Sequence, residues 1–188
     1  MVETVIRHKN NVNIACLGPL TNIARAFESY LTLPSFINTL YIMGHADIIE
    51  TKEGKQVYLN YRTHNFKVDP EAVDIVFASS VQKVVIPTKL AKKHWLSRDK
   101  FMSMPKTDPV GNYISLEGMR WLDKIGHENS FLYDPLTVAH HGNPKLTEKV
   151  SHDAVSVATA ILPSSERFEN AVFDSITQKD YKPRRGQE

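Results

Sequence analysis

Apolar residues in the first ninety positions repeat one plan twice, a short buried strand followed by an amphipathic helix. Residues 12–17 form a mostly apolar run that is typical of a buried strand. Gly18 then permits a tight turn, and Pro19 suits the first position of a helix. The apolar residues that follow are spaced to line one helix face, and they are Leu20, Ile23, Ala24, Phe27 and Leu31. This segment predicts half of a βαβ unit.

The second repeat runs from a strand at residues 39–43, which ends at Gly44, to a strand at residues 83–87. Between them we expect a helix that Asp69 caps through its side chain. The connection over residues 45–67 is longer than a compact α/β domain needs, and connections of that length are usually functional or mobile. Alternating strands and helices predict an α/β fold, an open, mainly parallel sheet with helices on both faces.

The pattern after this repeat is less regular. Residues 89–128 are mostly helical but interrupted by prolines, and the clearest helix there spans residues 113–122. An Asp-Pro pair opens another helix at residues 134–141, and residues 155–160 alternate as a strand would. We expect one α/β domain over residues 1–165. A polar C-terminal tail should follow over residues 166–188, with disorder from residue 180 onward.

Composition narrows the class of protein. The 188 residues are 41% hydrophobic and 23% charged, which is ordinary for a globular chain with one core. A formal net charge of +2 is too small to favour nucleic acid or an acidic membrane surface as a partner. No stretch approaches the roughly 20 apolar residues of a membrane span, and the first residues do not read as a signal peptide. We therefore expect a cytoplasmic protein with no nucleic-acid or membrane partner. The single cysteine, Cys16, lies in an apolar run, which favours a buried structural thiol over a nucleophile.

Three segments carry the candidate chemistry, and they occur in a fixed order. They are residues 16–24 (CLGPLTNIA), residues 63–72 (THNFKVDPEA) and residues 131–139 (FLYDPLTVA). In that order and spacing they resemble the central and C-terminal signatures of the inosine–uridine preferring nucleoside hydrolases. The resemblance covers about residues 12–157. The first signature of that family, an N-terminal aspartate cluster that holds calcium, has no counterpart here. We therefore expect an N-terminally truncated member of the family.

The resemblance implies a particular site. The family hydrolyses the N-glycosidic bond of ribonucleosides to a free base and ribose, and a calcium ion holds the ribose hydroxyls and the attacking water. Calcium takes about 6–8 oxygen ligands. The resemblance places the main-chain oxygen of Leu17 and the carboxylate of Asp134 among these ligands, with Met43 and Asn65 holding the sugar. Each residue also has a plainer interpretation. Asp134 could only cap its helix, Asn65 could bond its own backbone, and Met43 could fill the core.

Two residues depart from the family pattern within these segments. Thr63 stands where the family usually has a glutamate that binds the 5′ side of the ribose. Tyr133 stands where many members carry a histidine that protonates the departing base. Since a phenol has a pKa of about 10 against about 6.5 for imidazole, Tyr133 is the poorer general acid near pH 7. His45 and His64 lie near the expected pocket and could replace the lost acid. Without the aspartate cluster, we expect the chain alone to bind calcium weakly at best.

Two kinds of function stay open. One is a nucleoside N-ribohydrolase of purine or pyrimidine salvage, acting on a nucleoside or ribose-like molecule and impaired as an isolated chain. The other is a non-catalytic nucleoside-binding or protein-interaction module that retains the scaffold, or a gene fragment. A sheet without its first strands exposes an edge, so we expect a second copy or a partner chain to cover it. Adjacent helical histidines do not converge on a metal, so His140 and His141, with His152 nearby, are interpreted as surface or core residues.

Overall fold

The computed structural model describes residues 1–142, 147–161 and 172, and the chain divides into two compact units. The first unit comprises Met1–Lys93 and Leu132–Pro163, and the second comprises His94–Phe131 and Ser164–Glu188. Each unit is described by itself. The expected polar tail over residues 166–188, with its disordered end, lies outside the described residues apart from residue 172.

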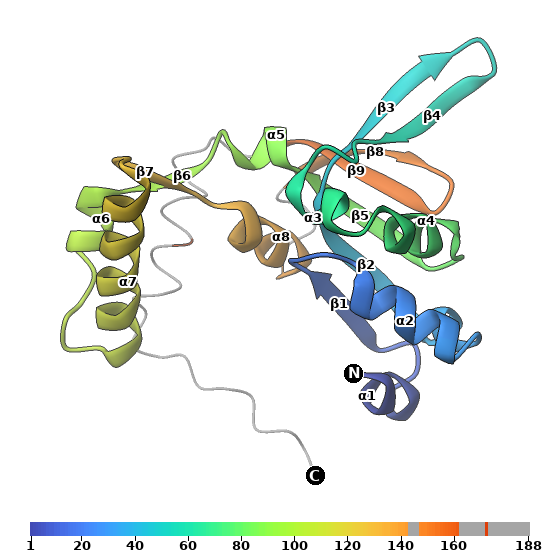
Figure 1. Cartoon of the computed structure of the whole chain (residues 1–188), viewed down its shortest axis with the longest axis horizontal. Helices are drawn as coiled ribbons and strands as arrows, with labels where there is room; N and C mark the ends of the chain where they lie inside the picture. Colours follow the sequence, from blue (N-terminus) through green and yellow to red (C-terminus); the bar gives the residue numbers. More distant parts are fainter. Residues whose placement is uncertain (143–146, 162–171, 173–188) are drawn as a thin grey trace. The chain divides into compact units, whose positions relative to one another are not determined.

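A five-stranded sheet forms the centre of the first unit, in the order β1-β2-β5-β9-β8 (Figure 1). Its strands are β1 (Val12–Cys16), β2 (Ile37–Gly44), β5 (Gln82–Pro87), β9 (Val155–Ile161) and β8 (Thr147–His152). Neighbours from β1 to β9 are parallel, and β8 is antiparallel to β9. The prediction of an α/β fold with a mainly parallel sheet is confirmed. Within the described residues β1 pairs only with β2, so its other edge is unpaired.

Helices cover both faces of this sheet, as the alternation of side chains along β2 shows. Leu40 and Ile42 belong to the main apolar core together with residues of α2 (Thr21–Ser29) and α4 (Pro70–Ala78). Tyr41, which points to the opposite face, has its ring 5.7 Å from that of His140 and 4.9 Å from that of His141. Both histidines belong to α8 (Tyr133–Gly142). The sheet is therefore enclosed by α2 and α4 on one side and by α8 on the other.

Smaller elements complete the ends of the sheet. They are α1 (Val2–Arg7), the 3₁₀ helix η1 (Leu33–Phe36), α3 (His64–Val68) and α5 (Thr88–Ala91). Cys16 is buried at the end of β1, and burial raises the pKa of its thiol to about 12, which agrees with a structural role.

Both ends of α4 are held by side chains. At its start Asp69 accepts a hydrogen bond from the amide of Ala72 at 3.1 Å, which confirms the predicted cap. Beyond its end the buried Lys83 donates from Nζ to the carbonyl oxygens of Ser79 at 2.6 Å and Val81 at 2.8 Å. These carbonyls have no helical partner of their own to satisfy them, so the ammonium takes that role.

The long connection after β2 folds differently from the expectation. Instead of a loop, it forms an antiparallel hairpin of β3 (Ala46–Thr51) and β4 (Gly54–Leu59), followed by α3. The turn of this hairpin carries Gly54 at φ 122°, a conformation that glycine adopts without strain. The hairpin gives the connection its own backbone hydrogen bonds, so its length does not imply an irregular loop.

The described part of the second unit is a pair of packed helices with a short two-stranded ribbon. Its elements are β6 (Trp95–Ser97), α6 (Arg98–Met102), α7 (Pro109–Ile125) and β7 (Asn129–Phe131). Asp108 caps α7, and Gly126 ends it in a left-handed conformation at φ 67°. The predicted helix at residues 113–122 lies inside α7. In the ranges that the structure describes, no helix is long and apolar enough to cross a membrane.

Candidate active site

The structure brings all six sequence-predicted site residues together around one cavity of the first unit, with a volume of about 390 Å³. Leu17 follows β1, Met43 lies near the end of β2, and Thr88 directly follows β5. The cavity therefore opens at the carboxyl edge of the parallel strands, where ligands of open α/β sheets bind. Its lining residues are Leu17, Met43, Gly44, Thr63, His64, Asn65, Thr88, Lys92, Tyr133 and Asp134.

Asn65 ties the ends of two strands together. Its Nδ2 donates hydrogen bonds to the main-chain oxygen of Met43 at 2.9 Å and to that of Leu17 at 3.3 Å. These partners are 22 and 48 residues away, so the plainer interpretation of an amide that bonds only its own loop is wrong. Both amide hydrogens are used, which leaves Oδ1 as an acceptor for a ligand hydroxyl.

Met43 and Gly44 form the floor of the cavity. Met43 is buried, with 5% of its surface exposed, so it packs in the protein interior and lines the cavity at once. Gly44 lies against the ring of Phe66, since a Cβ at this position would stand 2.3 Å from two of the ring carbons. Phe66 is fully buried and directly follows Asn65, so this close approach fixes where the Asn65 backbone lies.

Asp134 lies in the first turn of α8, which begins one residue earlier at Tyr133. It makes no hydrogen bond or ion pair with any other described residue, so the interpretation of Asp134 as a helix cap finds no support. The carboxyl group is exposed at the mouth of the cavity, yet the surrounding protein atoms remove enough water to raise its pKa. An unengaged carboxylate at a cavity mouth is available to accept hydrogen bonds from sugar hydroxyls or to bind a cation.

The remaining predicted residues contribute hydroxyl groups. The Thr63 hydroxyl donates to the main-chain oxygen of Asn60 at 2.9 Å, which leaves its oxygen as an acceptor. Tyr133 is half-buried, and desolvation raises the pKa of its phenol further above that of an ordinary tyrosine. The phenol therefore stays protonated near neutral pH and donates a hydrogen bond, but it gives up its proton less readily still.

His64 and His45 lie on different cavities. His64 is exposed and lines the cavity described above, near Thr63 and Asn65. His45 lines a neighbouring cavity, and its Nε2 lies 3.3 Å from an Oδ2 of Asp47. Of the two candidate replacements for the lost acid, only His64 is placed at the six-residue site.

The described residues do not fit a calcium ion by themselves. Leu17 and Asp134 offer one carbonyl and one carboxylate, whereas calcium takes about 6–8 oxygen ligands. The Leu17 carbonyl also already accepts the hydrogen bond from Asn65. Throughout residues 1–142 and 147–161, no three His, Cys, Asp or Glu side chains gather as a metal site would require.

Thr88 and Lys92 line the cavity but were not predicted. Thr88 donates a hydrogen bond of 3.3 Å from its hydroxyl to the main-chain oxygen of Gly44, which joins the ends of β5 and β2. Lys92 follows the short helix α5 and brings a positive charge to the same cavity as Asp134. Both residues lie in a stretch without a motif. Only the position of Thr88 directly after a parallel strand could have suggested it, and Lys92 had no such signal.

The fold and the cavity define an α/β protein with a small-molecule site at the end of its sheet. The model of the inosine-uridine preferring nucleoside hydrolase family matches residues 1–184, so the chain belongs to that family. This confirms the family that the three motifs indicated.

Known relatives agree with this assignment. Over 158 residues the chain is 30% identical to the pyrimidine-specific ribonucleoside hydrolase RihA of Escherichia coli (strain SMS-3-5 / SECEC), covering 78% of this chain and 47% of the relative. The chain thus spans about half the length of the curated relatives it matches.

Two solved structures share the fold. A purine-preferring ribonucleoside hydrolase from Gardnerella vaginalis has a TM-score of 0.76 at 19% identity, covering 94% of this chain and 63% of that one. The type III effector XopQ, complexed with adenosine diphosphate ribose, has a TM-score of 0.71 at 16% identity, covering 95% and 62%.

Proposed function

We propose that this chain forms the ribose-binding side of a nucleoside N-ribohydrolase site, which cleaves the N-glycosidic bond of a ribonucleoside to base and ribose. The observation that carries the proposal is the convergence of three distant sequence motifs on one cavity. Leu17, Asn65 and Asp134 are up to 117 positions apart by their numbering, and a shared cavity is the simplest reason for all three motifs to be present.

In this proposal the oxygen atoms of three side chains accept hydrogen bonds from the ribose, and the phenol of Tyr133 faces the base. The Oδ1 of Asn65 and the carboxylate of Asp134 accept hydrogen bonds from ribose hydroxyls. Thr63 accepts a further one, in place of a charged carboxylate. The Tyr133 phenol donates to the departing base, which aids departure less than an imidazolium would.

The described residues lack the aspartate cluster that supplies the family's general base, and they do not supply a full set of calcium ligands. We propose that carboxylates from a further segment, in this or another polypeptide, complete the site for hydrolysis. The open edge of β1 offers one place for such a segment to pair, because its backbone groups have no strand beside them among the described residues. Monodisperse monomer in sedimentation, with a single cooperative unfolding transition, would contradict pairing of this edge with another polypeptide.

The ligand class is a nucleoside or another ribose-bearing molecule. The names of the relatives support this class, since RihA is a ribonucleoside hydrolase and the XopQ structure holds adenosine diphosphate ribose. A second candidate, binding of ribose without hydrolysis, is favoured by the small number of oxygen ligands at the cavity.

Nucleoside binding and ribose release together test these proposals. Purified chain is titrated with inosine and with uridine by calorimetry, and reducing sugar is measured in parallel with calcium present. We expect binding that Asn65→Ala and Asp134→Ala each weaken at least tenfold, while the exposed Lys124→Ala in the second unit serves as the matched control. Folded protein that binds neither nucleoside would overturn the proposed function. Ribose release by the chain alone, lost in Asp134→Ala, would instead show that the site is complete and refute the need for a further segment.

A further inference from the structure

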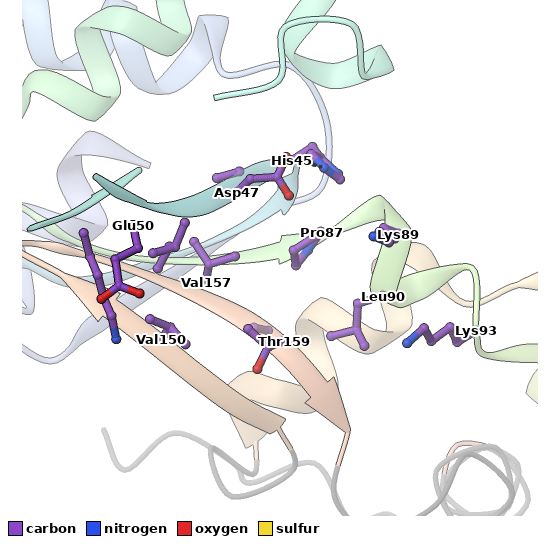
Figure 2. A pocket seen from close by; sticks show the side chains of 14 residues that line it. His45, Asp47, Glu50, Pro87, Lys89, Leu90, Lys93, Val150, Val157 and Thr159 are labelled. Atoms are coloured by element: carbon purple, nitrogen blue, oxygen red, sulfur yellow. Dashed lines mark ion pairs between the residues drawn. The ribbon is translucent and has the colours of Figure 1, made fainter. Parts of the chain in front are cut away.

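A second cavity of about 440 Å³ lies in the same unit, between the hairpin β3–β4, the helix α5 and the strands β8 and β9. Figure 2 shows Lys89 and Lys93 at one end of this cavity and Glu50 at the other. Between them Val150 and Val157 present an apolar surface from the two strands. The cavity thus combines an apolar floor with charged ends.

The charges of this cavity are compensated at one end and not at the other. Glu50 and Lys55 stand opposite each other in the hairpin register, so each of these charges faces one of the opposite sign across the strand pair. Asp47 lies beside His45. Lys89 and Lys93 have no hydrogen bond or ion pair with any described residue, although both line the cavity. Lys89 belongs to α5 and Lys93 lies just beyond its end, so both bring an uncompensated positive charge to this end of the cavity, which an anion there would offset.

His45, which also lines this cavity, has one buried ring nitrogen without a partner among the described residues. Its side chain is 12% exposed, and its Nε2 faces Asp47. The buried Nδ1 finds no hydrogen-bond partner among the residues that the structure describes. A buried ring nitrogen in this state costs free energy unless a ligand or water reaches it.

The two cavities are adjacent, because consecutive residues line one and the other at three places, namely Gly44 and His45, Thr88 and Lys89, and Lys92 and Lys93. The boundary between them includes the Thr88 wall, which is the hydrogen-bonded pair of the Thr88 hydroxyl and the main-chain oxygen of Gly44. Three lysines, at positions 89, 92 and 93, therefore straddle the rim between the ribose-binding cavity and its neighbour.

We propose that the two cavities together bind a ribonucleoside phosphate, with its ribose in the first cavity and its phosphate groups against Lys89 and Lys93 beyond the Thr88 wall. This inference rests on the proposed function of the first cavity. Phosphate fits because lysine ammonium groups bind it as point charges, and both lysines are exposed and free to reach a phosphate at the end of the cavity. A neutral nucleoside leaves the second cavity and its lysines unused.

Calorimetric titration of the full chain tests this inference. The ligands are uridine, uridine 5′-monophosphate, uridine 5′-diphosphate and inorganic phosphate. Inosine and inosine 5′-monophosphate cover the other base class. We expect the nucleotides to bind at least tenfold more tightly than the matching nucleoside, with an advantage that shrinks as salt rises. The double variant K89Q/K93Q should bring the nucleotide-to-nucleoside affinity ratio close to one. The control K52Q/K124Q removes two exposed lysines outside both cavities and should keep the ratio of the unchanged chain.

Each outcome decides between the two proposals. Nucleoside binding without a nucleotide advantage, or an advantage that survives K89Q/K93Q, overturns this inference and leaves the proposed function standing. Inorganic phosphate that binds at these lysines while nucleotides gain no advantage shows an isolated anion site, and also overturns it. Binding of neither nucleosides nor nucleotides by folded protein removes the proposed function itself.

Discussion

Thr21 donates a hydrogen bond of 2.6 Å from its hydroxyl to the carboxylate of Asp69, which lies 48 residues further along the chain. The first residue belongs to the motif at residues 16–24 and the second to the motif at residues 63–72. The two motifs are thus physically joined, and the bond links the first residue of α2 to the cap of α4. This contact gives Thr21 and Asp69 a structural role, because it holds the two motif-bearing segments together.

Replacing Thr21 by valine should raise the pKa of Asp69 toward its ordinary value and lower the melting temperature. The hydrogen bond from Thr21 is the main reason that the pKa of Asp69 is lowered, ahead of the bond from the Ala72 amide. A group with a lowered folded pKa adds stability above its unfolded pKa and loses it as the pH falls through the folded pKa. NMR titration of Asp69 and thermal unfolding at neutral pH measure both effects. Thr107→Val, at an exposed position, is the control, and an unchanged Asp69 titration in Thr21→Val would contradict the assignment.

Gly44→Ala should destabilise the fold and weaken ligand binding together. The added methyl would stand 2.3 Å from the Phe66 ring, which is fully buried and has no room to move. Overpacking of this kind costs about 1–3 kcal/mol. Chemical denaturation gives the loss, and calorimetry gives the effect on binding through the displaced Asn65. Gly18→Ala is the matched control for stability, because nothing lies within 4 Å of its Cβ. Equal stability of the two variants would show that Phe66 yields easily.

Acidification should destabilise the first unit through His140. This residue is fully buried on α8, and its Nδ1 lies 2.8 Å from the Thr147 hydroxyl. Burial, with smaller contributions from Lys149 and His141, lowers the pKa of His140 from 6.5 to about 4. Between these values the unfolded chain binds the proton and the folded chain does not, so stability falls as the pH drops from 6.5 to about 4.

The loss through His140 amounts to up to about 3 kcal/mol across that window. Denaturant midpoints measured from pH 7 to pH 4 give the slope, and His140→Gln should flatten it. His8→Gln, at an exposed position, should leave the slope as it is. A His140→Gln variant with the same acid sensitivity as the unchanged chain would assign the loss to other groups.

Asp134→Asn should gain stability at neutral pH while it loses ligand binding. Desolvation raises the pKa of Asp134 in the folded state, so the ionised form is disfavoured by folding. That contribution is favourable at low pH and is lost as the pH rises through the folded pKa, whereas asparagine carries no charge at any pH. The melting temperature of Asp134→Asn should therefore exceed that of the unchanged chain at pH 7. At pH 3 the difference between the two melting temperatures should be smaller. Functional residues commonly lower the stability of the fold in this way. An Asp134→Asn variant that is less stable than the unchanged chain at pH 7 would contradict this prediction.

Local chemistry explains which parts of the structure could be predicted from the sequence. The cap by Asp69 depends on residues within one helix turn, so its sequence signal is complete. The helix predicted over residues 113–122 stops short of the end of α7 at Gly126. The hairpin β3–β4 turns at Lys52 and Glu53 without an Asn-Gly or Asp-Gly pair, and its polar strands lack a strong alternation, so no local signal marked it.

The site residues also differ in whether a local sequence signal marks them. Leu17, Asn65 and Asp134 could be named because each lies in a motif. The second cavity, by contrast, depends on where β8 and β9 lie against α5, and no strand is predicted from the sequence at residues 147–152. Lys89 and Lys93 therefore looked like ordinary surface lysines until the tertiary arrangement placed them on a shared cavity.

The buried amine of Lys83 can serve as a natural probe of local opening in this protein. Burial lowers the pKa of this group to about 8, so a substantial part of it is a neutral, reactive amine in mildly alkaline solution. Yet only 1% of the residue is exposed, and its nitrogen is held by the carbonyls of Ser79 and Val81. An amine-selective label can reach it only when the end of α4 separates from β5. The rate at which Lys83 is labelled, compared with exposed lysines, therefore reports how often the centre of the sheet opens, without any engineered reporter.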